Sequence, residues 1–337
     1  MGMTLETLWF AIVALFWLGY LFLEGFDFGV GMLLPVLGKT NTERRVLVNT
    51  IGPVWDGNEV WLIVAAGATF AAFPGWYASL FSGAYLPLLL VLIALIGRGV
   101  AFEYRGKVDS ERWRRAWDRV IIIGSWVPPL GVGLLLATTV LGLPLDAQGN
   151  RVGSPFESVR WDTLLGAVAI VGFSLVHGAA FLALKTTGDL RERARTIALR
   201  VLPVGLLPLV AFLVVVQVRE GKLWTLVSLV IAVLAAVVAW LRLYVDRDGQ
   251  AFAALAVVIT AAAVTFFGAL YPNVLPSTLD PAHSLTITNS AVSHYTLTVM
   301  TWVGAFGAPA VLIYQGWTYW VFRKRIGVQH IPAVHAP

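Results

Sequence analysis

Long apolar runs alternate with short polar segments along the whole chain. Nine runs approach or exceed the roughly 20 mostly apolar residues that a helix needs to cross about 30 Å of hydrocarbon. They cover residues 8–37, 51–73, 78–102, 117–143, 162–184, 199–218, 223–243, 251–271 and 292–321. The runs lack the alternation of barrel strands, and open backbone cannot face lipid. The pattern predicts an all-α polytopic membrane protein with about nine transmembrane helices.

The polar connections are too short to hold a soluble domain, so residues 1–337 are predicted to form a single transmembrane domain. The longest connections cover about 144–161 and 272–291 and are rich in turn-forming residues. By number alone, eight of the nine helices could form two four-helix bundles, leaving one extra helix. The first run begins near Leu8 without a preceding basic segment, so it is expected to remain as the first span rather than to be cleaved.

Basic residues are concentrated on one side of the predicted membrane. The segments after the first, third, fifth and seventh runs, together with the C-terminal tail, contain 19 of the 24 Lys and Arg residues, whereas the opposite segments contain 4. Under the positive-inside rule, this asymmetry places the N-terminus outside and the C-terminus in the cytoplasm. The net charge of +5 therefore reflects topology, and no nucleic-acid partner is expected.

The composition supports a membrane protein and excludes several kinds of chemistry. The chain is 58% hydrophobic and 13% charged, whereas soluble domains contain about 25% charged residues. It has no cysteine, which removes disulfides, thiolate metal sites and thiol nucleophiles. It also lacks a Gly-rich phosphate loop, a nucleophile elbow and a zinc motif. Any chemistry is therefore expected to use buried carboxylates or a partner protein.

Ionisable residues inside the predicted spans are the most informative positions, because charged groups in a membrane are costly and usually paired or functional. The first span contains Glu24 and Asp27, whose i, i+3 spacing puts both carboxyl groups on one helix face. Two acids this close could share a proton. The alternative is an acidic pair that a neighbouring helix holds for packing.

Further ionisable groups lie toward the predicted cytoplasmic side. Asp56 and Glu59 share a face where the second span begins; they either carry protons or cap the helix N-terminus. Glu103 and Lys107 have the i, i+4 spacing of a helical ion pair. They either begin a proton uptake path or end the third helix as a solvated pair. Arg98 lies one turn deeper and is expected to neutralise one of the membrane carboxylates.

His177 is the one histidine of five that falls clearly inside a predicted span. A six-coordinate haem in a helix bundle takes two facing axial ligands, usually His or Met. With one membrane histidine and four methionines, two of them near the N-terminus, the chain is not expected to bind haem. A hydrogen-bonded packing role is expected for His177, and no metal site is expected.

Several of these segments together resemble subunit II of the cytochrome bd quinol oxidases. The resemblance is carried by residues 25–33, 55–63 and 98–107, with shorter matches at 42–45, 81–83, 125–129 and 297–302. It implies a heterodimer in the cytoplasmic membrane of a prokaryote. The partner, subunit I, would carry haem b and haem d, oxidise quinol and reduce dioxygen to water. This chain would scaffold it, and the resemblance leaves small accessory subunits and a structural quinone open.

The resemblance also implies that this chain delivers protons from the cytoplasm. In the family, carboxylates at the positions of Asp27, Asp56 and Glu103 are associated with that delivery, as is the lysine at Lys107. The family often has Gln where this chain has Glu59. The resemblance therefore does not carry the proton-delivery role over to Glu59. Reducing dioxygen to water consumes protons, and a relay of titratable groups or waters could supply them.

Two other classes of function fit parts of the sequence. A secondary ion-coupled transporter also places carboxylates in membrane helices, but it is expected to have matched broken helices, which the first two spans lack. A purely structural membrane scaffold would tolerate neutral replacements of Asp27 and Asp56. Copurification with a haem-bearing partner would separate both from the oxidase hypothesis.

Overall fold

The computed structural model describes residues 4–154, 156 and 159–331, which form helices and one small hairpin. The helices are α1 (Leu5–Leu37), α2 (Asn41–Ile51), α3 (Trp55–Ala72), α4 (Pro74–Gly83), α5 (Tyr85–Tyr104), α6 (Glu111–Leu141), α7 (Trp161–Lys185), α8 (Gly188–Gly205), α9 (Leu207–Glu220), α10 (Leu223–Tyr244), α11 (Asp248–Leu270) and α12 (His294–Val321). The strands β1 (Asn273–Leu275) and β2 (Leu285–Thr286) pair antiparallel between α11 and α12.

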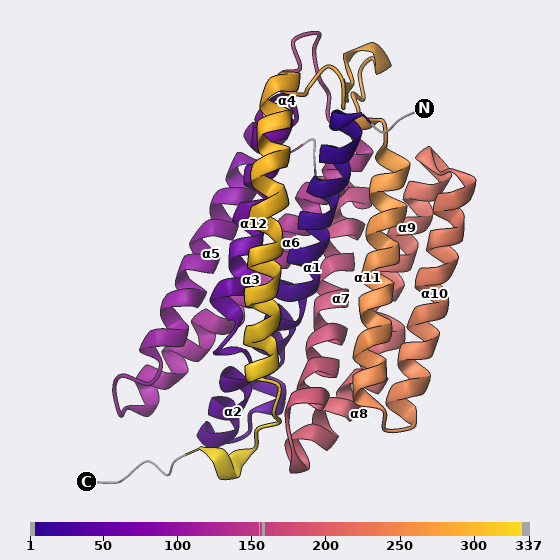
Figure 1. Ribbon diagram of the computed structural model, residues 1–337. Coiled ribbons are helices and arrows are strands. Elements are labelled where there is room, and N and C mark those ends of the chain that lie inside the picture. Colours follow the sequence, from indigo (N-terminus) through magenta and orange to yellow (C-terminus); the bar gives the residue numbers. More distant parts are fainter. Residues whose placement is uncertain (1–3, 155, 157–158, 332–337) are drawn as a thin grey trace.

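Within the described residues, eight helical segments are long and apolar enough to cross a membrane. One of them combines α8 and α9 into Gly188–Glu220. The predicted range 51–73 corresponds to α3, which has 18 residues and begins with a polar turn. α3 leads from α2 at one end of the bundle to α4 at the other, so it adds a further crossing (Figure 1). The prediction of an all-α polytopic membrane protein is confirmed.

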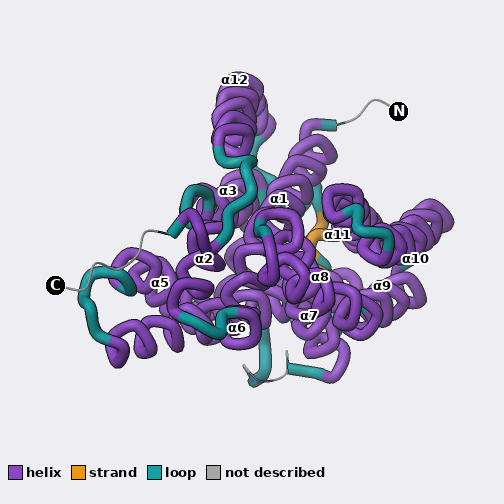
Figure 2. Tube along the Cα trace, turned by 90° about the horizontal axis from the view of Figure 1, so that it is seen from below, coloured by secondary structure: helices purple, strands orange, loops and turns teal. Residues whose placement is uncertain are grey.

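The helices form two groups and one separate helix. α1, α3, α5 and α6 lie on one side, and α7 to α11 lie on the other, while α12 stands apart (Figure 2). α7 joins the two groups because it packs against both α1 and α6. Leu297 is the single buried residue of α12, so this helix is held mainly by a few side-chain contacts. The arrangement agrees with the predicted division into two bundles plus one helix.

α1 begins at the upper end of the molecule and α12 ends at the lower end (Figure 1). The connections between α1 and α3, α5 and α6, α7 and α8, and α10 and α11 lie at the lower end (Figure 1). Together with the adjoining ends of the helices and the segment after α12, they contain most of the Lys and Arg residues. The positive-inside rule therefore assigns the lower end to the cytoplasm.

Glycines allow α7 to approach α1 closely at the centre of the molecule. A Cβ atom added to Gly29 would lie 2.0 Å from the carbonyl oxygen of Ser174, and one added to Gly178 would lie 2.5 Å from the backbone of Gly29. Small residues at such crossings are typical of packed membrane helices. The contact holds the second half of α1, which contains Glu24 and Asp27, in the protein interior.

Ion pairs connect the cytoplasmic ends of the helices. Asp118 of α6 lies 2.5 Å from Arg105, just after α5, and 2.8 Å from Arg44 of α2. Glu43 of α2 pairs with Arg193 of α8. Burial opposes ionisation of Glu43, but hydrogen bonds from Arg193 and from two preceding backbone N–H groups hold the pKa of its carboxyl below the usual value. These pairs fasten α2 to both helix groups.

The segment that follows α12 is fastened to the ends of α7, α8 and α11. The N–H of Ile326 donates to the carbonyl oxygen of Lys185 at 2.9 Å. Arg325 lies 3.2 Å from the buried carboxylate of Asp248, which also pairs with Arg191 at 2.8 Å. The cytoplasmic end of α12 is therefore tied to the second helix group, although the helix itself stands apart.

Candidate functional site

A cluster of ionisable side chains is buried where α1, α3 and α5 meet. Glu24 and Asp27 of α1 and Arg98 of α5 are completely buried. Nη1 of Arg98 lies 2.8 Å from Oε2 of Glu24 and 3.8 Å from Oε2 of Glu59, which α3 contributes. The expectation that Arg98 neutralises a membrane carboxylate is confirmed. The cluster therefore contains three carboxyl groups and one guanidinium.

Aromatic rings and a glycine keep Arg98 in place. The Cζ atom of Arg98 lies 4.7 Å from the ring centroid of Phe28 and 5.3 Å from that of Phe102. A Cβ atom added to Gly124 of α6 would lie 2.6 Å from Cβ of Arg98, so only glycine lets α6 pack against this turn of α5. Attraction to the rings adds to the pairing with Glu24.

Asn58 of α3 links this cluster to α12. Its Nδ2 donates a hydrogen bond to Oδ2 of Asp27 at 2.8 Å. Its Oδ1 accepts from the hydroxyl of Tyr319 at 2.7 Å and from Nε2 of Gln315 at 3.2 Å. The indole N–H of Trp61 donates to Oε1 of Gln315 at 2.8 Å. The buried carboxyl of Asp27 is therefore connected through neutral polar side chains to the helix that stands apart.

Several polar atoms of the cluster are buried without a hydrogen-bond partner among the described residues. They are the Tyr20 hydroxyl, Oε1 of Glu24, Oδ1 of Asp27, Oε2 of Glu59, and Nε and Nη2 of Arg98. Buried polar atoms are nearly always paired with protein or water, and unpaired ones are costly. Unpartnered polar atoms are therefore concentrated at this one place among the described residues.

The predicted residues of α3 lie between this cluster and the surface. Asp56 is exposed, and its Oδ1 accepts a hydrogen bond from the N–H of Gly57 at 2.7 Å. Glu59, one turn further along the helix, is partly exposed and also faces Arg98. The Asp56 carboxylate therefore accepts a hydrogen bond within the first turn of its own helix. Glu59 lies between the surface and Glu24.

The structure places Glu103 and Lys107 at the exposed end of α5. The expected i, i+4 ion pair is wrong, because α5 ends at Tyr104 and Lys107 lies beyond the helix. In the part of the chain that the structure describes, no ion pair joins the two side chains. Arg105, which the sequence did not single out, turns inward at this point and pairs with Asp118 instead.

His177 is enclosed by aromatic side chains. Its Nε2 lies 3.2 Å from the carbonyl oxygen of Phe22, and its ring stacks between Phe252 and Phe173 with centroids 4.6 Å and 4.9 Å away. These contacts leave no space for a haem at His177. Across residues 4–154, 156 and 159–331, no group of three or more His, Cys, Asp or Glu side chains is arranged to hold a metal ion.

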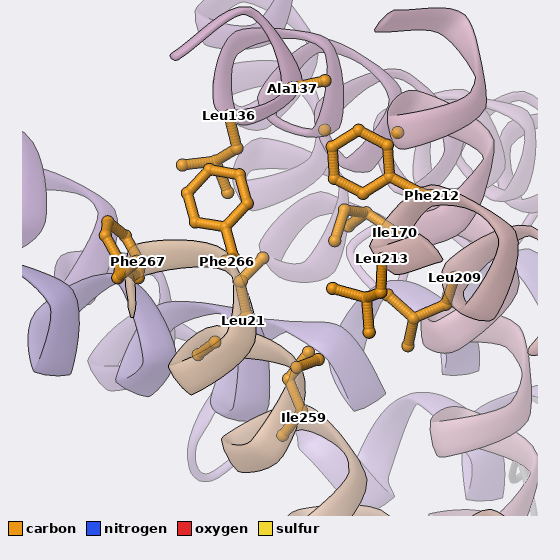
Figure 3. Close-up of a pocket in the computed structure, with 14 residues that line it drawn as sticks. Leu21, Leu136, Ala137, Ile170, Leu209, Phe212, Leu213, Ile259, Phe266 and Phe267 are labelled. Atoms are coloured by element: carbon orange, nitrogen blue, oxygen red, sulfur yellow. The ribbon is translucent and has the colours of Figure 1, made fainter. Parts of the chain in front are cut away.

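A small cavity of about 40 Å³ lies between α1, α6, α7, α9 and α11. Figure 3 shows its lining side chains, among them Leu21, Leu136, Phe212 and Phe266, all of which are apolar. An entirely apolar lining offers no group that can hold or pass a proton. This cavity therefore differs in character from the carboxyl cluster, whose atoms are polar.

Comparisons with known proteins agree with one another. The family model for cytochrome bd terminal oxidase subunit II matches residues 5–322. The chain is 41% identical over 329 residues to the cytochrome bd ubiquinol oxidase subunit 2 of Bacillus subtilis, covering 96% of this chain and 97% of the relative. It is 35% identical over 368 aligned positions to the cytochrome bd-I ubiquinol oxidase subunit 2 of Escherichia coli K12, covering 97% and 96%.

The fold also matches a solved structure. A chain in the structure of bd oxidase from Geobacillus thermodenitrificans aligns with a TM-score of 0.78 at 20% sequence identity, over 95% of this chain and 99% of that chain. At this identity the likeness shows the shared fold.

Proposed function

Because the chain belongs to the cytochrome bd terminal oxidase subunit II family, we propose that it is the haem-free partner of a haem-bearing subunit and supplies it with cytoplasmic protons. The chain is a multi-pass membrane subunit of an oxidoreductase complex, and its relatives are named as ubiquinol oxidase subunits. Quinol oxidation and reduction of dioxygen to water then take place on subunit I. The buried cluster of Glu24, Asp27 and Glu59 around Arg98 is the observation that carries the proposal.

The charge balance of the cluster favours proton storage. One guanidinium balances one carboxylate, so neutrality requires protons on two of the three carboxyl groups. An uncompensated charge in an apolar interior costs several kcal/mol. A proton that leaves the cluster is therefore readily replaced, because its replacement restores neutrality, and this exchange is the property that a relay needs.

The positions of the carboxyl groups suggest the direction of transfer. Asp56 is exposed near the cytoplasmic end of α3, Glu59 is partly exposed one turn deeper, and Glu24 and Asp27 are completely buried. We place proton uptake at Asp56 and transfer through Glu59 toward the buried pair, with water between the groups. Glu103 and Lys107 are exposed near the cytoplasmic end of α5, where they can attract protons to the same side.

The face formed by α3 and α12 is the proposed docking surface for the haem-bearing subunit. Asp56 is exposed on a membrane helix, where a charge facing lipid would be costly. A Cβ atom added to Gly57 or Gly67 of α3, or to Gly307 or Gly316 of α12, would meet no other atom within 4 Å. Glycines with empty space on the side where a Cβ would lie allow another helix to approach closely. A partner seated here would cover Asp56 and lie next to the cluster.

The haems are assigned to the partner because His177, the one buried histidine among the described residues, has no room for a haem. His177 is stacked between phenylalanine rings, and no step of the proposed proton transfer passes through a haem bound to this chain. The chain contributes a scaffold and titratable groups. Accessory subunits and a structural quinone are not needed for either contribution.

Neutral replacements of the carboxyl groups test the proton-delivery proposal. Asp56→Asn and Asp27→Asn keep size and polarity but cannot carry a proton, so turnover is expected to fall by roughly tenfold or more with haem content unchanged. Asp56→Glu should retain more activity because it restores a titratable group. Asp109→Asn, which changes an exposed carboxylate paired with Arg114, is the matched control and should leave turnover unchanged.

The measurement is quinol oxidation per assembled haem in each variant complex. Wild-type rates in both Asp56→Asn and Asp27→Asn would exclude these groups from an obligatory proton path and leave the chain as a scaffold. A loss of rate that follows a loss of assembled complex would point to a structural role instead.

A further inference from the structure

The hydrogen bonds from Trp61 to Asp27 can run in one direction only. An indole N–H is a donor and never an acceptor, so Trp61 requires the oxygen of the Gln315 amide to face it. That orientation turns Nε2 of Gln315 toward Asn58, at 3.2 Å from its amide oxygen. If the Asn58 amide were reversed, two N–H donors would face each other across this gap. Asn58 must therefore present Oδ1 to Gln315 and Nδ2 to Asp27.

The same orientation decides how Asp27 can be protonated. Because Nδ2 of Asn58 donates to Oδ2 of Asp27 at 2.8 Å, Oδ2 must remain an acceptor. A proton on Oδ2 would turn this oxygen into a hydroxyl, which is a weaker acceptor for that N–H than a carbonyl oxygen. The other oxygen, Oδ1, is buried and has no hydrogen-bond partner among the described residues. Tyr319 is compatible with this arrangement, because its hydroxyl donates to Oδ1 of Asn58.

We infer that Trp61, Gln315 and Asn58 are positioning residues that reserve Oδ2 of Asp27 as an acceptor and direct its proton to Oδ1. None of the three carries a proton itself; they act through Asp27. The inference rests on the proposed function in one respect, namely that Asp27 holds a proton during turnover. It also gives α12 a role, since Gln315 connects the orientation of this carboxyl to the helix that stands apart from the bundle.

The ionisable groups around this carboxyl come from five helices. They are Glu24 and Tyr20 on α1, Glu59 on α3, Arg98 on α5 and Tyr319 on α12, while α7 contributes His177. Any measurement that varies pH therefore needs an assignment to Asp27 itself. An infrared band that disappears in Asp27→Asn provides this assignment.

Infrared difference spectra of the assembled complex, recorded over a range of pH, test the inference. With the proton on Oδ1, the C=O of the acid is formed by Oδ2 and accepts the hydrogen bond from Asn58. Asn58→Leu removes that donor, so the Asp27 carbonyl band is expected to shift to higher wavenumber. Trp61→Phe, a milder change, frees Gln315 to reverse and should produce a second band beside the first. Trp126→Phe on α6, whose half-exposed indole lies on another helix, is the matched control and should change nothing.

The outcomes separate this inference from the proposed function. An Asp27 band that stays in place in both Asn58→Leu and Trp61→Phe overturns the inference, because the carbonyl would then be formed by Oδ1. If no acid band is assigned to Asp27 at any pH, proton storage on Asp27 is refuted. In that case the ionised carboxylate band must still shift in Asn58→Leu, and an unshifted band overturns the inference as well. If Asn58→Leu does not assemble, Trp61→Phe alone decides the result.

Discussion

Replacing Arg98 with methionine is expected to prevent accumulation of the folded subunit and of its complex. The guanidinium is completely buried and lies 2.8 Å from Glu24. Removing one partner of a buried ion pair leaves the other without compensation and typically costs about 3–5 kcal/mol, a large part of the stability of a protein. The amount of haem per milligram of total membrane protein should fall more than tenfold, because the haem-bearing subunit is not expected to accumulate without its folded partner.

Two further variants separate charge from packing at this position. Arg98→Met combined with Glu24→Gln removes both charges and should recover part of the assembled complex. Arg114→Met, which removes an arginine paired with the exposed Asp109, is the matched control and should assemble normally. Normal haem content in Arg98→Met alone would show that the pair with Glu24 is dispensable and that the cluster has been assigned the wrong role.

Gly29→Ala is expected to have the second largest effect. The added methyl group would lie 2.0 Å from the carbonyl oxygen of Ser174 on α7, far inside van der Waals contact. Because backbone, not a flexible side chain, occupies that space, α1 and α7 must separate. Overpacking of this kind costs about 1–3 kcal/mol or more. The thermal midpoint of the purified complex should fall, and the neighbouring carboxyl cluster should lose its geometry and with it turnover.

Gly67→Ala on α3 is the matched control for this prediction. An added Cβ there meets no atom of this chain within 4 Å, so the subunit itself should fold as before. If Gly67→Ala lowers only the stability of the complex with subunit I, the proposed docking surface is supported. Equal midpoints for Gly29→Ala and the wild type would contradict the close helix crossing.

The fold was predictable from the sequence where a single local property determines it. Apolar length and the distribution of Lys and Arg are each read within one segment, and they gave the helical architecture and the expected orientation. α3 shows the limit of this reasoning, since its first five residues include Asp56, Asn58 and Glu59 and the helix has only 18 residues. Its place in the bundle depends on packing against α1, which no local pattern encodes.

The candidate site was predictable only in part. Charged residues in apolar runs stand out, so Glu24, Asp27 and Arg98 could be singled out. Asn58 and Gln315 are neutral and 257 positions apart, so nothing local reveals that they form a hydrogen bond. Polar residues within the apolar sequence of α12 were the available signal.

The prediction of an ion pair between Glu103 and Lys107 was wrong because it relied on their spacing alone. A pattern of i, i+4 charges has meaning only inside a helix, and α5 ends at Tyr104. Arg105, directly after the helix, pairs with Asp118 of α6, and the helix has ended before Lys107 is reached. The position of the helix end and this pair between α5 and α6 are tertiary features that the local spacing of charges does not show.

Haem content measured with and without the partner tests the central claim most directly. The optical spectrum of the native complex should show haem, and the complex should contain this chain together with a haem-bearing subunit. The chain expressed alone and purified in detergent should contain no stoichiometric haem, because His177 is enclosed by aromatic rings. Retention of one haem per isolated chain would contradict the account of this protein as the haem-free subunit.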